Sequence, residues 1–437
     1  MKVRRLTMLL VMGFWVIFTT FEVMAKPVDI QFWYSQAGGR EDTLREIVDA
    51  FNQSQGEYTV VPVNKGSYDE TMNAGIAAFR SKNPPHILQV YDVGTQTMML
   101  SNAIYPVYNL MKDTGNRIDW KGYLQPVLSY YESSNGELQS MPFNSSTPVM
   151  YYNKDIFKKA GLTDPPRTWD DMGKDTAKLV ACGVQYGMVT AWQTWIMIEN
   201  YSAIQNIPIS TEANGFDGLN ASLTINHPLI VHHFERLKKW MNDKRFVYEG
   251  REYRKANAAF LSGKCAILMD STSTIGVLKT EAKFNWAAAP LPVEVSNKEP
   301  QNSIIGGASL WVLKGHPEAD YRGVARFLKF LSSQDMQILW HKETGYLPIT
   351  VNAYEALNTS GYYQKNPAQE VGILQLTRKA PTIYSRGIRL GNFTQIRVVM
   401  NDELEMLWQG KKTAQQALDD AVRRGNEILR KFDMSNQ

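Results

Sequence analysis

The alternation of strand and helix patterns near the start of the chain is the strongest constraint on its fold. β-rich runs at 30–34, 58–63 and 86–91 are separated by two stretches in which apolar residues recur at helical spacing. This order predicts a parallel sheet with helices on its faces, and such sheets bind small molecules beyond the carboxyl ends of their strands. Residues that follow these strands are therefore candidates for a binding site.

Two polar side chains fall at that predicted edge. Ser67-x-x-Glu70 is a capping box, so it predicts a helix whose first turn contains Tyr68, beside free backbone N–H groups that attract anions. Asp92 directly follows the third strand. Both residues are therefore placed where a ligand of the sheet would bind.

A second α/β block begins in the stretch from Met141 to Gly161. Two hydroxyls, Ser145 and Ser146, precede a β-rich run at 147–152, and a turn and a short helix follow. This pattern is also that of an ordinary strand-turn-helix unit. Because the first block ends here, however, the two serines fall where the chain would pass between lobes, and clefts between lobes are favoured ligand sites.

Strand ends in the second block carry further candidates. Trp192 and Trp195 follow a strand at 186–190 and are candidates for a stacking wall, although most tryptophans pack in cores. A strand at 264–269 leads into a polar cluster that contains Ser271, and this cluster is equally consistent with a plain helix cap.

Three more candidates follow along the chain. Gly306 and Gly307 interrupt a β-rich run that we interpret as the return of the chain to the first lobe, and they expose backbone amides without side chains. Tyr346 adds an aromatic hydroxyl in a turn, and Arg397 is a cation among apolar residues of the helical tail. Hydroxyls, amides and one arginine together suit an anionic group with several oxygens.

The N-terminus predicts export. A basic start, a short apolar run and small residues before Lys26 are typical of a secretory signal peptide over residues 1–25; the apolar run is short for a membrane anchor. The formal net charge of the 437-residue chain is only +4, so nothing favours nucleic acid as a partner. The length is sufficient for two cores.

The chain lacks the common catalytic and metal-binding motifs. It contains no nucleophile elbow, H-E-x-x-H motif or phosphate loop, which favours a binding protein over an enzyme. Cys182 and Cys265 have no metal-site spacing, and they would form a disulfide only if their Cα atoms lie close enough. Neither a metal nor a cofactor is implied.

Eight stretches resemble the periplasmic sn-glycerol-3-phosphate-binding proteins of ABC importers, and the resemblance covers essentially the whole chain after the signal segment. They are N-K-G-S-Y (64–68), N-A-G-I-A-A-F-R (73–80), I-L-Q-V-Y-D-V-G-T (87–95), P-F-N-S-S-T-P-V-M-Y-Y-N-K-D (142–155), N-G-F-D-G (214–218), I-I-G-G-A-S-L-W-V (304–312), T-G-Y-L-P-I-T (344–350) and R-L-G-N-F-T-Q-I-R-V (389–398).

The resemblance implies a two-lobed α/β fold similar to that of maltose-binding protein, with a mainly parallel sheet flanked by helices in each lobe and a hinge between them. The N-terminal lobe would comprise 26–143 and 308–350, and the C-terminal lobe 144–307 and 351–437. The protein would capture sn-glycerol 3-phosphate or glycerophosphodiesters in the periplasm and deliver them to permease subunits that work with a cytoplasmic ATPase.

The resemblance also implies roles for individual residues. Asp92 and the Trp192 ring would meet the glycerol hydroxyls. The family usually carries Glu at the position of Asp92 and a small neutral residue at that of Asp270. Because side chains alternate along a strand, Asp270 is expected to point away from the side of Ser271 and need not repel the phosphate. If it did, a less charged diester would be favoured. The residues that would hold the phosphate are Tyr68, Ser146, Ser271, the Gly307 amide, Tyr346 and Arg397.

Two alternatives remain open at this point. A sugar receptor would need several aromatic platforms and many partners for hydroxyls, but it would not need Arg397. A secreted phosphodiesterase or glycosidase would turn over the ligand that it binds.

Overall fold

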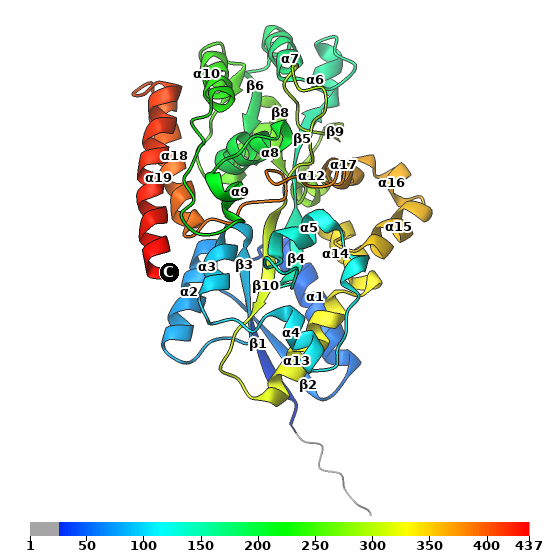
Figure 1. The fold of residues 1–437 in the computed structure, drawn as a ribbon. Helices are drawn as coiled ribbons and strands as arrows, with labels where there is room; N and C mark the ends of the chain where they lie inside the picture. The colour runs from blue at the N-terminus through cyan, green and yellow to red at the C-terminus, as the bar shows by residue number, and fades with distance from the viewer. Residues whose placement is uncertain (1–25, 437) are drawn as a thin grey trace, which may run out of the picture.

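The computed structural model describes residues 26–436 and shows two α/β lobes stacked one above the other (Figure 1). The predicted signal peptide lies outside the described residues. Each lobe is built on one five-stranded sheet. The two-lobed α/β fold is therefore confirmed, whereas the lobe boundaries given above stay a prediction.

The first sheet has the strand order β2-β1-β3-β10-β4. Its strands are β1 (Val28–Tyr34), β2 (Tyr58–Asn64), β3 (Ile87–Tyr91), β4 (Met141–Ser146) and β10 (Gly306–Val312). β1 is parallel to β2 and β3, whereas β10 is antiparallel to β3 and β4.

The second sheet has the order β7-β6-β8-β5-β9. Its strands are β5 (Pro148–Asn153), β6 (Tyr186–Thr190), β7 (Phe246–Val247), β8 (Cys265–Ser271) and β9 (Trp286–Ala289). β6 is parallel to β7 and β8, and β5 is antiparallel to β8 and β9.

In each sheet four of the five strands run in the same direction, as expected, and one strand, β10 or β5, runs against its neighbours. The reason lies in the two strands that enter a lobe from the other one. β5 and β10 start at the cleft, whereas β3 and β8 end there, so each entering strand runs against its neighbour. The carboxyl ends of β3, β4, β6 and β8 still face the cleft, as a parallel arrangement would have placed them.

Helices surround both sheets (Figure 1). Those up to the first crossing are α1 (Gly39–Ser54), α2 (Tyr68–Arg80), the 3₁₀ turn η1 (Asp92–Gly94), α3 (Thr95–Leu100), α4 (Val107–Asp113), the 3₁₀ turn η2 (Trp120–Gly122) and α5 (Gln125–Tyr131). Those between the crossings are α6 (Lys154–Lys159), α7 (Trp169–Ala181), the π-helical turn η3 (Trp195–Asn200), α8 (Tyr201–Gln205), α9 (Thr211–Gly215), α10 (Pro228–Asn242), α11 (Tyr253–Leu261) and α12 (Thr274–Glu281). After β10 come α13 (Glu318–Leu331), α14 (Gln334–Thr344), α15 (Val351–Thr359), α16 (Tyr362–Lys365), α17 (Pro367–Leu376), α18 (Phe393–Trp408) and α19 (Ala414–Asn436).

Each lobe has its own hydrophobic core. Phe32, Val48 and Phe327 are among the fully buried residues of the first, and Met188 and Phe234 belong to the second. Two separate cores agree with the expectation from chain length.

Two segments that pass between the lobes are joined to each other. Only Thr147 separates β4 from β5, and its hydroxyl donates to the Ile304 carbonyl oxygen at 3.0 Å. The same hydroxyl lies 2.7 Å from the Ser303 Oγ, so it can accept from that serine. Residues 303–305 lead directly into β10. The outgoing and returning crossings therefore lie side by side.

Two further observations concern the whole chain. Cys182 and Cys265 are both free thiols. Among the described helices, none combines the length and the apolar character that a membrane span requires.

Candidate functional site

A cavity of about 550 Å³ lies between the lobes, at the cleft-facing ends of the strands. It is lined by all the residues that the sequence analysis proposed as ligand contacts, which are Tyr68, Asp92, Ser146, Trp192, Ser271, Gly307, Tyr346 and Arg397. Their placement in one cavity satisfies a necessary condition for the predicted roles. The roles themselves stay predictions.

Tyr68 is held as a hydrogen-bond donor toward the cavity. Its ring stacks on Tyr91 with the planes 5° apart and the centroids 5.3 Å apart. Its hydroxyl oxygen accepts from the Asn144 amide at 2.8 Å, and Gln89 fixes that amide by donating to its oxygen at 2.7 Å. Because the Tyr68 oxygen is an acceptor in this contact, its own O–H is the donor that it can offer, and the Tyr346 hydroxyl lies within hydrogen-bond reach of it.

The predicted capping box explains the position of Tyr68. Ser67 accepts from the Glu70 backbone N–H, and the Glu70 side chain accepts from the Ser67 N–H. The reciprocal bonds start α2 at Tyr68, at the carboxyl edge of the sheet. Tyr346 is oriented in a similar way to Tyr68, since its ring stacks on Trp340 at 5.5 Å with planes only 4° apart.

Ser146 and Gly307 contribute from two neighbouring strands. Gly306 pairs with Ser146, and Gly307 pairs with Ser145, where β10 crosses β4. Gly307 has φ +91°, and a Cβ there would lie 1.9 Å from the Asn144 carbonyl oxygen. Only glycine fits this position, and the close approach brings the backbone to the cavity wall without a side chain.

Ser271 ends β8 and belongs to a hydroxyl cluster. Its Oγ lies 3.0 Å from the Ser273 Oγ and accepts from the Ser273 backbone N–H at 3.2 Å. The preceding residue, Asp270, is fully buried, and its carboxylate accepts from Asn257, from Thr274 and from the Ser271 N–H. Burial raises the pKa of Asp270, and these hydrogen bonds oppose the rise. The carboxylate is thus satisfied without any cation.

Arg397 is clamped by two carboxylates. Its Nε and Nη2 donate to Glu199 at 2.7 and 2.6 Å, and Nη2 also reaches Asp92 at 3.2 Å. Burial raises the pKa of Asp92 to about 6, although the nearby Arg397 lowers it. The local charge around this arginine is therefore negative when both acids are ionised, which suits hydroxyl groups that donate to carboxylates better than it suits an anion.

Glu199 was not among the predicted residues. It lies in the apolar run W-I-M-I-E-N of η3 and is 1% exposed. An acid in such a run was the available signal, because a buried carboxylate needs a partner. The sequence did not reveal which cation is the partner of Glu199, because Arg397 lies about two hundred residues later in the chain.

Trp192 and Trp195 both line the cavity, and their role as a stacking wall stays a prediction. Trp192 remains 38% exposed and stacks on Tyr253 with centroids 5.0 Å apart. Trp195 is buried, lines the cavity and packs against Gly306, where a Cβ would come within 2.4 Å of the indole. Of the two rings, Trp192 is thus the one that remains accessible.

Arg40 also lines the cavity and was not predicted. It projects from the first turn of α1 and reaches two hydroxyls of the second lobe, Ser273 Oγ at 3.3 Å and Tyr253 OH at 3.2 Å. Acidic residues are favoured at helix N-termini, so the basic residue in the G-G-R-E stretch is unusual there and could have indicated a functional role for Arg40.

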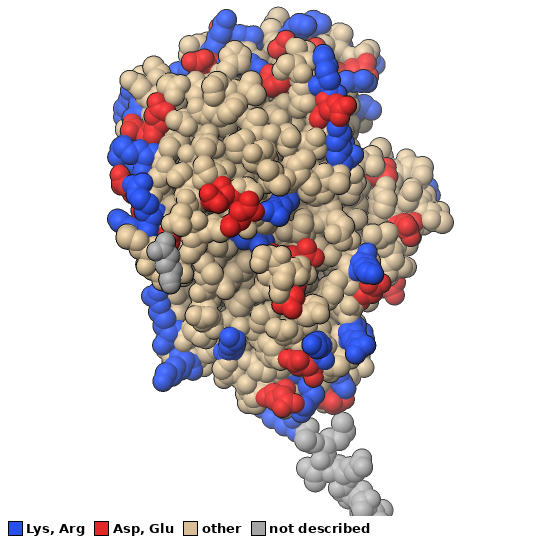
Figure 2. Space-filling model, viewed as in Figure 1, with Lys and Arg blue, Asp and Glu red and all other residues tan. Residues whose placement is uncertain are grey.

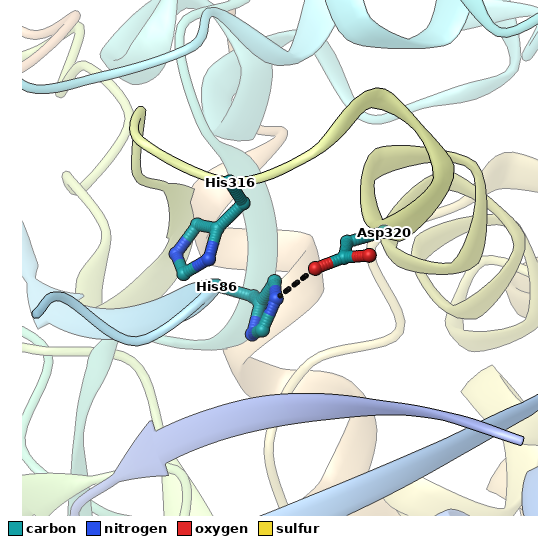
Figure 3. Close-up of side chains that lie close together, drawn as sticks. All are labelled: His86, His316 and Asp320. Atoms are coloured by element: carbon teal, nitrogen blue, oxygen red, sulfur yellow. Dashed lines mark hydrogen bonds and ion pairs between the residues drawn. The ribbon is translucent and has the colours of Figure 1, made fainter.

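One group of His and Asp side chains within residues 26–436 has the spacing of a metal site, and Figure 3 shows it. His86 Nδ1 accepts from the Gln31 N–H at 3.0 Å, so Nε2 carries the proton and donates to Asp320 at 3.1 Å. The His86 and His316 rings are stacked 3.7 Å apart, so their lone pairs do not converge on one point. This geometry fits a structural contact at the far end of β3, away from the cavity.

The face of the molecule shown in Figure 2 carries no dominant charge. Lys and Arg alternate with Asp and Glu over the face shown in Figure 2, with uncharged residues between them. This agrees with the nearly neutral composition, and it means that any preference for an anionic ligand must arise inside the cavity.

A two-lobed fold with a polar cavity at the hinge defines a receptor for small solutes. The chain belongs to the bacterial extracellular solute-binding protein family, whose model matches residues 46–371.

Among its relatives are the sn-glycerol-3-phosphate-binding periplasmic proteins UgpB. The chain is 47% identical to that of Yersinia enterocolitica over 413 residues, which cover 94% of each chain. It is 46% identical to that of Pectobacterium atrosepticum over 413 residues, which cover 94% of this chain and 93% of that protein. The resemblance inferred from the eight stretches is thereby confirmed.

Solved structures show the same fold. UgpB from Mycobacterium tuberculosis in complex with glycerophosphocholine superposes with a TM-score of 0.79 at 21% identity, covering 93% of this chain and 99% of that one. The GacH receptor of Streptomyces glaucescens, solved unliganded and with acarbose, gives a TM-score of 0.78 at 17% identity, with the same coverage.

Proposed function

We propose that the protein is the substrate-binding receptor of an ABC importer and that it captures sn-glycerol 3-phosphate or its diesters in the cavity between the lobes. The 47% identity to UgpB over 94% of the chain carries this proposal. The cavity supports it independently, because its donors and acceptors are divided between two ends that match the two parts of such a ligand.

One end offers neutral donors for a phosphate group. Tyr68, Ser271 and Tyr346 supply hydroxyls, Ser146 supplies another from β4, and the backbone at Gly307 lies open to the cavity. Hydroxyl and amide donors satisfy phosphate oxygens without importing counter-charges that must be desolvated. Each bond gains strength when closure of the lobes removes water.

The other end offers carboxylates for hydroxyl groups. Asp92 accepts from glycerol hydroxyls, and Glu199 lies behind it on the far side of Arg397. In this arrangement Arg397 orients the two acids and donates its remaining N–H groups toward the polyol. Trp192 covers the apolar face of the carbon chain from the mouth.

The size of the cavity extends the ligand class to diesters. A volume of about 550 Å³ lies within the range of roughly 300–1,000 Å³ that small-molecule sites occupy. Glycerol 3-phosphate is smaller than such a space, so the same cavity has room for a headgroup on the phosphate. Asp270 near Ser271 also favours the less charged ester.

The relatives are periplasmic binding proteins, and this supports a role in delivering the bound ligand to a membrane permease. As a periplasmic binding protein, the chain would be exported, would hold its ligand in the periplasm and would present it to the permease subunits in the inner membrane, which a cytoplasmic ATPase drives. Binding needs no covalent chemistry, so we infer a receptor without catalytic activity.

Calorimetry with the mature protein tests this function. Titration with sn-glycerol 3-phosphate and with glycerophosphocholine is expected to show binding of micromolar strength or tighter, equivalent to about −8 kcal/mol. Inorganic phosphate, which lacks the polyol, should bind more weakly, and maltose should not bind. Binding of maltose alone would establish a sugar receptor instead. Release of free glycerol or phosphate from the bound ester, followed by ³¹P NMR, would establish an enzyme.

A further inference from the structure

Four arginine side chains line the cavity, and they differ in whether a carboxylate neutralises them. Three form ion pairs, which are Arg397 with Glu199 and Asp92, Arg251 with Asp402 and Glu405, and Arg254 with Glu252. No carboxylate within the described part of the chain forms an ion pair with the fourth, Arg40. Its charge is therefore the one that a ligand can use.

Arg40 lies among the neutral donors at the phosphate end. Its contact with Ser273 connects it to Ser271, since the two serine oxygens are 3.0 Å apart. Its electrostatic neighbours are the phenol groups of Tyr346, Tyr253 and Tyr68 and the buried carboxylate of Asp270, with which it forms no ion pair. Those of Arg397 are Glu199, Asp92 and Tyr130. The two arginines thus serve opposite ends of the cavity.

The guanidinium of Arg40 has donors to spare. Its bonds to Ser273 and Tyr253 use one N–H on each Nη atom, and both partners are neutral hydroxyls. An arginine carries five N–H donors in a planar fork, so three remain for an oxygen ligand. A phosphate, which accepts from such a fork in a bidentate manner, is the natural complement.

The charge of Asp270 beside Ser271 favours a cation at the phosphate end in addition to the neutral donors. Asp270 is fully buried next to this serine and is satisfied by neutral donors alone, so its negative charge is not cancelled by an ion pair. An anion bound at Ser271 would be repelled by it at short range. Arg40 approaches the same point from the opposite lobe and offsets that repulsion.

We propose that Arg40 is the cation that binds the phosphate group and that it sets the preference of this receptor for anionic esters, while Arg397 positions Asp92 and Glu199 for the polyol. The proposal rests on the proposed function and names a residue for it. Because Arg40 belongs to the first lobe and the serines belong to the second, the phosphate bridges both lobes and couples binding to closure.

Arg40→Gln tests the proposal with two ligands that differ by one charge. At pH 7.5, sn-glycerol 3-phosphate is mostly a dianion, whereas its methyl diester is a monoanion. We expect the substitution to weaken binding of the monoester about 10- to 100-fold, which corresponds to the loss of one charge-assisted hydrogen bond. The loss of affinity for the diester should be several-fold smaller. Arg40→Lys keeps the charge and should recover part of the loss.

Arg45→Gln is the matched control. Arg45 lies on the same helix, is 49% exposed and pairs with Glu41 outside the cavity, so its removal changes net charge equally. We expect unchanged affinity for both ligands. Thermal unfolding of the Arg40 variants, followed by circular dichroism, checks that they remain folded.

Each outcome decides between the possibilities. If Arg40→Gln weakens both esters equally, Arg40 only helps to close the lobes through Ser273 and Tyr253, and the proposal is wrong. A loss below about threefold for the monoester would also overturn it. If the unsubstituted protein binds neither ester, the proposed function itself fails, and that result is visible before any variant is made.

Discussion

Removal of Arg397 should destabilise the protein strongly as well as impair binding. The Arg397 side chain is 15% exposed and lies between Glu199 and Asp92, which are 1% and 3% exposed, and it forms three hydrogen bonds to them. Arg397→Met keeps most of the side-chain volume but leaves two buried carboxylates without a cation. Deleting one partner of a buried ion pair costs about 3–5 kcal/mol of unfolding free energy, a large share of the roughly 5–15 kcal/mol that folded proteins possess.

The pH dependence of this loss follows from Asp92. Its pKa is already raised to about 6 with Arg397 beside it, and without that cation it rises further. A carboxyl whose folded pKa lies above its unfolded value binds a proton more tightly in the folded state. The penalty is therefore largest above the folded pKa and shrinks as the pH falls toward the unfolded value. We expect a smaller difference between variant and parent at pH 5 than at pH 7.5.

Urea unfolding at both pH values measures the effect. Glu199→Gln in the Arg397→Met background removes one orphaned charge and should recover part of the loss. Arg322→Met is the control, because Arg322 forms an exposed pair with Glu318 that contributes no more than about 1 kcal/mol. A loss below about 1 kcal/mol for Arg397→Met, or a loss independent of pH, would refute the view that this arginine neutralises two buried acids.

Three further predictions concern other residues. Gly307→Ala should weaken ligand binding and destabilise the fold by at least about 1 kcal/mol more than Gly115→Ala. Both glycines have positive φ, but only at Gly307 would the added Cβ clash with the Asn144 carbonyl oxygen. Equal unfolding free energies for the two variants would contradict the clash. Burial lowers the pKa of His341 from 6.5 to about 4, so the folded state excludes its proton and about 3 kcal/mol of stability is lost as the pH falls from 6.5 to 4. His341→Gln should flatten that part of the pH–stability profile, and an unchanged slope would reject the assignment. Asp92→Glu should shift the relative affinities for glycerol 3-phosphate and glycerophosphocholine, because the longer side chain moves the carboxylate toward the ligand; identical affinity ratios by calorimetry would rule this out.

Much of the first lobe was predictable because its signals are local. The Ser67–Glu70 capping box places Tyr68 at the start of α2, and the end of an apolar strand places Asp92 at the sheet edge. The Gly306-Gly307 pair likewise signals a close approach of backbone, which the Asn144 carbonyl explains. Strand direction was harder, since a residue pattern does not reveal from which side a strand enters its sheet.

The charge distribution of the cavity could not be predicted in the same way. Arg397 was expected among the phosphate ligands, and that role stays untested, but its ion pairs depend on how η3 and α18 meet in space. Arg40 was overlooked because its contacts, Ser273 and Tyr253, lie on the other lobe. Electrostatic partners separated by two hundred residues follow from the tertiary fold and not from spacing.

The bond between Thr147 and the Ser303–Ile304 segment has a practical consequence. These two connecting segments therefore pass between the lobes side by side at one place. A donor fluorophore on one lobe and an acceptor on the other would report, by energy transfer, a change in the distance between the lobes when the cavity is occupied. The protein offers a ready scaffold for an optical sensor of glycerophosphoesters.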